Sequence, residues 1–236
     1  MKTNIRQHGG FTLVELLVVI VIIAALAGLS APVILKQRKA ADRTEAINNI
    51  KQINLALIEF DNDYGGFPDN NTAEDVKDAT GSALSFGGTF SNDYLRQLVA
   101  AGNKSEKIFW CKTSFSPKKG DDIVSPGKAL DAGEVGFSYI MASQTDGQST
   151  SGDPGRPVLA TPSLKAQPNW EFDPEPYGDK AVVLRIDGSA KPETIRTDNK
   201  KISIGGRFLE TTGENTPWGT DINPVMRAPQ PRGNGN

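Results

Sequence analysis

The residues best placed to do chemistry lie within the first fifteen positions of the 236-residue chain. A short leader with Lys2 and Arg6 ends at Gly10, and Phe11 opens an apolar stretch whose only ionisable side chain is Glu15. A small, flexible glycine at this junction predicts a peptidase site. Hydrolysis after Gly10 would leave the apolar stretch on the mature protein, whereas a secretory signal loses its apolar stretch because the cut follows it. The same cut would create a new amine at Phe11, four residues from the carboxyl group of Glu15.

The apolar stretch, residues 11–31, is long enough to cross a membrane, which takes about 20 apolar residues in a helix. Ala24 and Gly28 form a pair of small residues that favours close helix packing in lipid. A carboxylate inside a bilayer costs a few kcal/mol, so Glu15 needs a partner or a function there. The alternative is that Glu15 lies near the interface and is hydrated.

This N-terminal segment resembles the prepilin signal of type IV pilins and of the pseudopilins of type II secretion. The matching residues are Gly10, Phe11, Thr12, Leu13, Glu15 and Pro32. The resemblance implies cleavage between Gly10 and Phe11 by a prepilin peptidase, and methylation of the new amine of Phe11 by the same enzyme. It also implies that Glu15 pairs with the amine of Phe11, partly on a neighbouring subunit, and that Pro32 takes part in assembly.

The orientation of the span depends on the resemblance. Lys2 and Arg6 precede the span, but four basic residues follow it closely, so counting positive charges does not place the N-terminus in the cytoplasm. The resemblance implies a single-pass inner-membrane protein with a cytoplasmic N-terminus and a periplasmic globular domain. After assembly, the subunit would belong to a periplasmic or extracellular filament.

Composition excludes several classes of function. The leader holds two of the 26 basic residues, so the mature chain carries a net charge of about −4, which does not suggest nucleic-acid binding. The single histidine, His8, also lies in the leader, which removes histidine-dependent catalysis and metal ligation from the mature protein. The single cysteine, Cys111, excludes an internal disulfide, and its apolar neighbours predict a buried side chain. We therefore expect no enzymatic activity.

The helical pattern continues beyond Pro32, although a proline there removes one backbone hydrogen bond. Apolar residues recur at three- and four-residue steps and predict one buried helix face. These residues are Ala40, Ile47, Ile50, Ile53, Leu57 and Phe60. The expected organisation is a leader at 1–10, a transmembrane helix at 11–31, an amphipathic helix at 32–63, a globular domain at 64–226 and a flexible tail at 227–236.

The globular domain is expected to be rich in β-structure. Asp187-Gly188 between two apolar runs predicts a hairpin, and Pro192 places its second strand at a sheet edge. The pattern further predicts a helix at 93–101 capped by Ser91 or Asn92, strands at 108–111, 136–142 and 201–204, loops at 69–90, 116–134 and 142–156, and an anchoring role for Trp218. A long N-terminal helix on a small antiparallel sheet with long loops is an α+β fold and matches the pilin fold.

No cofactor is expected, and calcium is the one metal considered. Major pseudopilins can bind calcium through a C-terminal loop, which makes Asp221 a candidate ligand by resemblance. Asp61 and Asp63 also lie in a predicted turn. Because calcium takes several oxygen ligands, solvated turn carboxylates are the favoured interpretation of all three.

The sequence thus predicts a structural subunit of a type IV pilus-like filament, best described as a type II secretion pseudopilin. Its partners would be copies of itself, other pilins or pseudopilins, the prepilin peptidase and methyltransferase, and an inner-membrane assembly platform. One alternative is a surface type IV pilin for adhesion, motility or DNA uptake, although the missing cysteine pair and the low basicity argue against it. A second is a membrane-anchored periplasmic binding module or enzyme, in which Trp110, Trp170 and Trp218 could stack on sugars.

Overall fold

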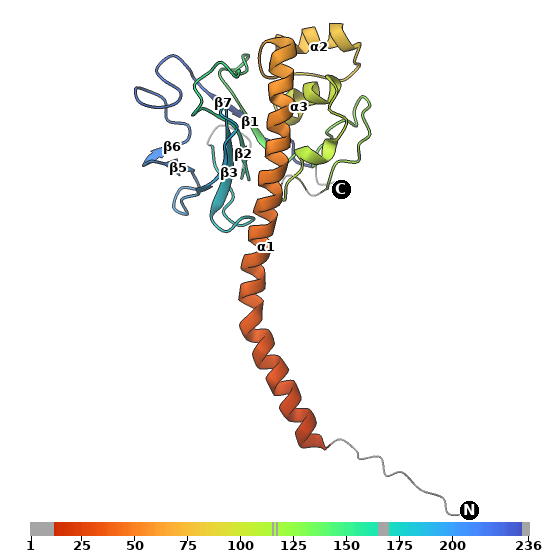
Figure 1. Ribbon diagram of the computed structural model, residues 1–236, viewed down its shortest axis with the longest axis vertical. Helices are drawn as coiled ribbons and strands as arrows, with labels where there is room; N and C mark the ends of the chain where they lie inside the picture. The colour runs from red at the N-terminus through yellow and green to blue at the C-terminus, as the bar shows by residue number, and fades with distance from the viewer. Residues whose placement is uncertain (1–11, 115, 117, 165–169, 233–236) are drawn as a thin grey trace, which may run out of the picture. The chain divides into compact units, whose positions relative to one another are not determined.

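A computed structural model describes residues 12–114, 116, 118–164 and 170–232. Helix α1 runs from Leu13 to Tyr64 and is 52 residues long. It is the long helix in Figure 1. The chain divides into two compact units, Met1–Lys39 and Ala40–Asn236, and α1 contributes to both. The predicted long N-terminal helix is confirmed.

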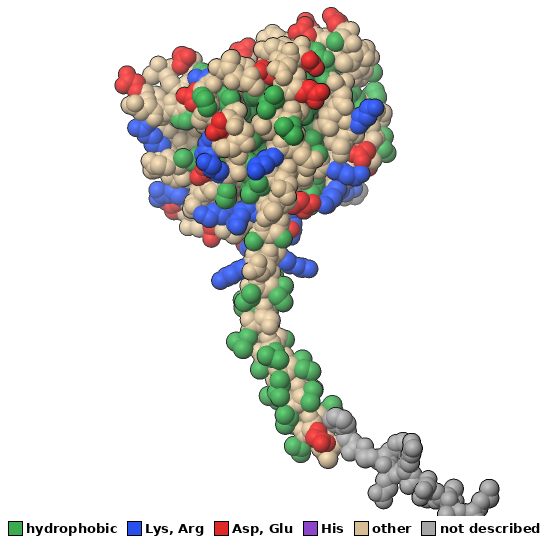
Figure 2. All heavy atoms as spheres, in the orientation of Figure 1, with side chains coloured by type: hydrophobic (Ala, Val, Ile, Leu, Met, Phe, Trp, Pro, Cys, Tyr) green, Lys and Arg blue, Asp and Glu red, His purple; other side chains and the backbone are tan. Residues whose placement is uncertain are grey.

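In the first unit, the side chains of residues 12–38 are exposed along the whole segment. Its best 18-residue window has a mean hydropathy of 2.8, and none of that window is buried. Hydrophobic side chains therefore cover the visible face of this segment in Figure 2. By length and composition, the segment can cross a membrane.

The second unit holds the C-terminal half of α1, two short helices, a 3₁₀ turn and two sheets. Helix α2 spans Thr72–Thr80, α3 spans Ser91–Ala100, and η1 spans Glu106–Phe109. The strands are β1 (Ser138–Met141), β2 (Pro157–Thr161), β3 (Lys180–Arg185), β4 (Ala190–Thr194), β5 (Ser203–Ile204), β6 (Arg207–Phe208) and β7 (Val225–Arg227). The α+β class is confirmed.

The main sheet has five strands in the order β4-β3-β2-β1-β7, and every neighbouring pair is antiparallel. The predicted hairpin joins β3 to β4, with Leu184 opposite Ala190. Gly188 has a φ of 76°, a left-handed conformation that glycine adopts without strain. Pro192 lies on β4, which is an edge strand, so its missing N–H costs no hydrogen bond within the sheet.

Both faces of the main sheet are buried. Tyr139 and Leu184 belong to a core cluster with Ile50, Ile53 and Leu57 of α1. The opposite face carries a second cluster, built by segments that follow β2 and β4 and by the C-terminal region. Its members are Ile140, Ala160, Trp170, Phe172, Ala181, Val183, Ile195, Ile202, Leu209, Trp218 and Met226. The apolar run in β3 therefore supplies buried side chains to both faces of the sheet. Many antiparallel strands instead bury one face and expose the other to water.

Two predictions near the start of the second unit were wrong. Residues 69–90 include α2, whose first turn is capped by Asp69: its Oδ1 accepts hydrogen bonds from the backbone N–H groups of Asn71 and Thr72, at 2.7 and 2.8 Å. The predicted strand at 108–111 overlaps η1 instead, because a four-residue apolar run does not distinguish a strand from a helical turn. The helix predicted at 93–101 exists but begins at Ser91, with Phe90 in the cap position.

The C-terminal boundary also differs from the prediction. Arg227 pairs with Tyr139 in the β1–β7 ladder, and the backbone N–H of Ser91 donates to the carbonyl of Ala228 at 2.9 Å. The flexible tail was expected to begin at Arg227, but Arg227 and Ala228 are held by these backbone contacts. The composition of the C-terminal segment does not predict these contacts, because main-chain hydrogen bonds do not depend on the side chain.

Candidate functional site

The first turn of α1 is closed by a reciprocal pair, Thr12 and Glu15. The Thr12 backbone N–H and hydroxyl both donate to Glu15 Oε2, at 2.8 and 2.6 Å. The Glu15 backbone N–H donates back to the Thr12 hydroxyl at 3.2 Å. This capping box satisfies two backbone donors that the start of a helix would otherwise leave without partners.

The Glu15 side chain therefore caps the helix, in addition to its predicted pairing with the amine of Phe11. All hydrogen bonds of the Glu15 side chain with described residues use Oε2, and no described residue donates to Oε1. Sequence reasoning missed this role of Thr12, although Thr followed three residues later by Glu is the signature of a capping box. Gly10 and Phe11 lie outside the described residues, so cleavage, methylation and the amine pairing stay predictions.

The span that follows offers a continuous apolar surface with a small-residue patch. The Cβ that a substitution at Gly28 would add meets no atom within 4 Å, and Ala24 is exposed one turn earlier. A partner helix could therefore approach this face closely.

Helix α1 continues through Pro32, which confirms that the helical pattern resumes there. Because proline lacks an N–H, the carbonyl of Gly28 loses its normal hydrogen-bond donor. The Ser30 hydroxyl donates to the Leu26 carbonyl at 2.7 Å, a contact that competes with the main-chain ladder. The turn before Pro32 is therefore a weak point in an otherwise regular helix.

The calcium candidates are not brought together as a ligand cluster. Among the described residues, no group of three or more His, Cys, Asp or Glu side chains could hold a metal ion. Asp61 Oδ2 instead accepts hydrogen bonds from the backbone N–H and hydroxyl of Thr150, and Asp221 is exposed. Calcium binding by Asp221 stays a prediction.

The chemically distinctive side chains of the second unit belong to its core. Cys111 is fully buried, with Sγ 3.1 Å from the Thr161 hydroxyl, and burial raises the pKa of this thiol to about 12. The predicted buried cysteine is therefore confirmed. Trp218 is buried as predicted, donates from Nε1 to the Leu209 carbonyl at 2.8 Å, and packs edge-on against Trp170. Neither tryptophan offers an open face for sugar stacking.

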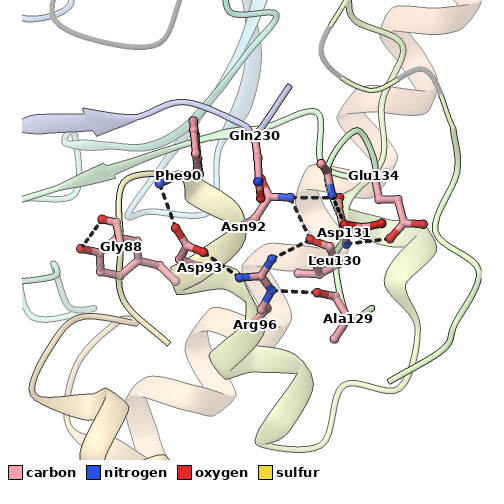
Figure 3. A network of polar contacts seen from close by, with 12 residues as sticks. Gly88, Phe90, Asn92, Asp93, Arg96, Ala129, Leu130, Asp131, Glu134 and Gln230 are labelled. Carbon is pink, nitrogen blue, oxygen red and sulfur yellow. Dashed lines mark hydrogen bonds and ion pairs between the residues drawn. The ribbon is translucent and has the colours of Figure 1, made fainter. Parts of the chain in front are cut away.

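A polar network fixes the loop at 129–134 and the C-terminal segment to α3, as Figure 3 shows. Arg96 Nε donates to the Ala129 carbonyl at 2.7 Å, and Asn92 Nδ2 donates to the Leu130 carbonyl at 2.9 Å. Asn92 Oδ1 accepts the backbone N–H of Gln230 at 2.8 Å. These side chains satisfy main-chain groups that no strand pairs, so the network stabilises the second unit and carries no evident chemistry.

Comparison with known proteins places the candidate site in a recognised class. Residues 5–31 match the model of the prokaryotic N-terminal methylation motif. This match spans the predicted cleavage junction, the capping box and the apolar span. The chain therefore carries a pilin-type N-terminal signal on an α+β fold.

Curated relatives narrow the class. The chain is 39% identical over 67 residues to type II secretion system core protein G of Pectobacterium carotovorum subsp. carotovorum, which covers 28% of this chain and 42% of that protein. It is 39% identical over 71 residues to the core protein G of Escherichia coli (strain K12), which covers 30% of this chain and 48% of that protein. The core protein G of Pseudomonas aeruginosa is 40% identical over 63 residues, or 27% of this chain and 44% of that protein.

The chain thus spans less than half the length of these curated relatives. No solved structure matches it significantly. The resemblance to pseudopilins is confirmed for a limited part of the chain, and these relatives do not cover most of the second unit.

Proposed function

We propose that this chain is a structural subunit of a pilus-like filament, of the type II secretion pseudopilin kind. The observation that carries the proposal is an entirely exposed apolar helix segment that forms most of a methylation motif and continues into a folded unit. A helix that is apolar on all sides requires either lipid or other apolar helices around it. A subunit stored in a membrane and then assembled into a fibre meets both environments in turn.

The precursor would be cut between Gly10 and Phe11 and methylated at the new amine by the prepilin peptidase and methyltransferase. The mature subunit would wait in the inner membrane with its N-terminus in the cytoplasm and residues 40–236 in the periplasm. An inner-membrane assembly platform would then extract it into a filament with copies of itself and other pseudopilins. In the fibre, the spans would exchange lipid for neighbouring helices.

The Oε1 atom of Glu15, to which no described residue donates, supports a docking role for this side chain. When a new subunit enters, the carboxylate would pair with the Phe11 amine of a neighbour while Oε2 keeps the helix capped. Neutralising two charges inside an apolar bundle is strongly favoured, because the low dielectric strengthens their attraction. Docking would therefore be selective for a processed subunit.

The secretion system is preferred to a surface pilus because the curated relatives are core proteins of type II secretion. The single buried cysteine also means that no disulfide staples the C-terminal region. We further propose that the role is not enzymatic, since the mature chain has no histidine and its one thiol is buried and protonated.

Processing and filament formation by the full-length chain test this proposal. Cells with a type II secretion machine that lacks its own core protein G would express the wild-type chain or Gly10→Val, and parallel cells would carry a type IV pilus machine. We expect mass spectrometry to find an N-terminal methylated Phe11 in the wild type and an intact leader in Gly10→Val, with Gly10→Ala impaired less. Fibres should form only in the wild type and only with the secretion machine.

Two results would contradict the proposal. A cut after Ala25 or Ala31 would remove the span and exclude the whole class. Fibres that form only with the pilus machine would instead favour a surface type IV pilin.

A further inference from the structure

The C-terminal half of α1 borders a groove of about 550 Å³ within the second unit. We call it the α1 groove. Its helix wall is formed by Gln52, Leu55, Ala56, Glu59, Phe60 and Asp63, and its opposite wall by Leu98, Ala101, Gly102, Asn103, Lys104, Ser105 and Ile108. The helix-wall positions recur at three- and four-residue steps and form one side of α1, on which Ala56 and Phe60 border the core and Leu55, Glu59 and Asp63 are exposed.

The α1 groove contains groups that lack partners. Leu55 is 68% exposed. Glu59 and Asp63 are exposed and make no hydrogen bond or ion pair with any described residue, and no basic residue occupies the last turn of α1. Asn103 Nδ2 is buried without an acceptor.

Two of these features are unfavourable for an isolated subunit. A carboxylate such as Asp63 in the last turn lies at the negative end of the helix dipole, where a cation would be favoured. Leu55 exposes apolar surface beside it. Lys104 on the opposite wall is exposed and forms no ion pair with a described residue, so it does not neutralise the two acids. The helix wall therefore suits a partner with an apolar surface and a cation.

The first unit of the same chain has that combination. Ile34, Leu35 and Arg38 lie on one helix face, because they are spaced by three and four residues. Ile34 and Leu35 are 56% and 58% exposed, and Arg38 is exposed without an ion pair to any described residue. Lys36 is equally exposed but points to the other side of the helix, since two residues rotate the chain by about 200° at 3.6 residues per turn.

We propose that the α1 groove binds the Ile34–Leu35–Arg38 face of a second copy of this chain. The guanidinium of Arg38 would lie between Glu59 and Asp63, and the two aliphatic side chains would cover Leu55. The inference rests on the proposed function, because a filament brings parallel copies of α1 into contact. It names the partner surface that would fix how one copy docks beside another.

The charge of the groove favours a second copy over a lipid headgroup. Anionic phospholipids could bind Arg38. Inside the α1 groove, however, their headgroups would be repelled by Glu59 and Asp63. A headgroup would also leave the groove itself without an occupant. The two partners therefore predict different results when the groove acids are changed.

Cysteine cross-linking of the full chain tests the contact directly. Native Cys111 is fully buried and its thiol is protonated at neutral pH, so it should stay unreactive. Cells would co-express Arg38→Cys and Glu59→Cys chains, and the same pair with Lys36→Cys in place of Arg38→Cys as the matched control. We expect a cross-linked dimer for the first pair and a yield about tenfold lower for the control, because Lys36 faces away from the groove.

Charge reversal gives the second measurement. Glu59→Arg should lower filament yield about tenfold, since it places like charges opposite each other. The control Glu74→Arg makes the same change at an exposed site on α2, outside the groove, and should leave the yield unchanged. Combining Arg38→Glu with Glu59→Arg should restore the yield, which a folding defect would not allow.

Failure of this inference can be separated from failure of the proposed function. Cross-linking would be measured in membranes and in filaments. Normal filaments with no cross-link, or equal effects of Glu59→Arg and Glu74→Arg, would overturn the groove contact alone. A cross-link in membranes without any filaments would overturn the filament role and keep the contact. Weaker binding of anionic phospholipid by the reconstituted Arg38→Glu chain, with unchanged filaments, would assign Arg38 to lipid and overturn the inference.

Discussion

The two halves of helix α1 contain similar aliphatic residues in opposite surroundings. Ile20 is 56% exposed in the first unit, whereas Ile50 and Ile53 are fully buried in the second. The N-terminal half is apolar on every side, while the C-terminal half alternates a buried face with a polar one. Aliphatic side chains make burial favourable in both halves of α1. They are buried only where another segment packs against them.

The exposed half of α1 is its N-terminal half, whose apolar side chains have no partner within the chain. An apolar surface without a partner is a large free-energy cost in water, since each buried aliphatic side chain contributes about 1.5–3 kcal/mol. The first unit leaves its whole apolar segment in that condition. It therefore requires an environment that the chain alone does not provide, whereas the second unit provides its own.

The largest expected effect comes from removing the charge of the exposed half. Glu15→Val should leave membrane insertion intact, because the segment becomes more apolar, but it should abolish filament assembly by removing the partner of the Phe11 amine. Membrane fractionation and electron microscopy of sheared fibres measure the two steps.

Glu15→Gln is the matched control for that prediction. An amide oxygen can still accept the Thr12 hydrogen bonds and close the capping box, but the charge is lost. We expect Glu15→Gln to fail in assembly as well. If it assembles normally while Glu15→Val does not, helix capping and not charge pairing is the essential role.

The second largest effect is expected from changing leucine to alanine in each half of α1. Leu57→Ala removes a fully buried side chain from the core and should lower the free energy of unfolding of the second unit by about 2–5 kcal/mol. Leu16→Ala, at a 59% exposed position, should leave that free energy unchanged. Urea unfolding of the detergent-solubilised full chain, followed by tryptophan fluorescence, measures both. Equal losses would show that the span packs on the folded unit.

A smaller effect concerns the boundary between the halves. We expect residues 24–32 to lose helical structure in the fibre, because Gly28 and Ser30 are weak helix formers and Pro32 donates no backbone hydrogen bond. Extension would raise the rise per residue from ~1.5 Å towards ~3.3 Å. Hydrogen exchange of assembled fibres should be faster at 24–32 than at 46–60, and Pro32→Ala should slow it. A fibre map with an unbroken helix from Phe11 to Phe60 would contradict this expectation.

The smallest effect is a pH dependence of the folded unit. Burial raises the pKa of Glu106 above its ordinary value of 4.5, although the Leu130 N–H donates to its Oε1 at 2.7 Å. The folded protein therefore holds this proton more tightly than the unfolded chain. The stability that the protonated group contributes is full below pH 4.5 and is lost as the pH rises through the folded-state pKa.

Glu106→Gln should flatten this decline in stability between pH 4.5 and neutral pH, as measured by urea midpoints across that range. Glu74→Gln is the matched control, since Glu74 is exposed on α2 and is not among the charges that act on Glu106. An unchanged slope in Glu106→Gln would mean that another group causes the pH dependence.

Local signals in the sequence predicted the features that depend on neighbours along the chain. The periodic apolar face of α1 at Ile50, Ile53 and Leu57 follows from 3.6 residues per turn. The hairpin at Asp187-Gly188 follows from turn chemistry, and the edge position of Pro192 follows from its missing N–H. The capping box of Thr12 and Glu15 is equally local, since it joins two residues three positions apart.

Features that depend on distant residues were not predicted. β7 exists because its main chain pairs with β1, more than 80 residues earlier, and nothing in its own composition requires a strand. Helix α2 is short and buries only Thr72, Ala73 and Val76, so its formation depends on the Asp69 cap and on packing. The second core layer around Trp218 likewise joins segments that are far apart in sequence.

The sequence by itself determined the exposed half of α1, the methylation motif and the absence of histidine after position 8. These features are set by composition and by spacing within a few residues, where the physics is that of one helix in its solvent. Only the tertiary structure decided that both faces of the sheet are covered and that Leu55, Glu59 and Asp63 border an open groove. Burial is a property of contacts between distant segments, and no local pattern specifies which of them will meet.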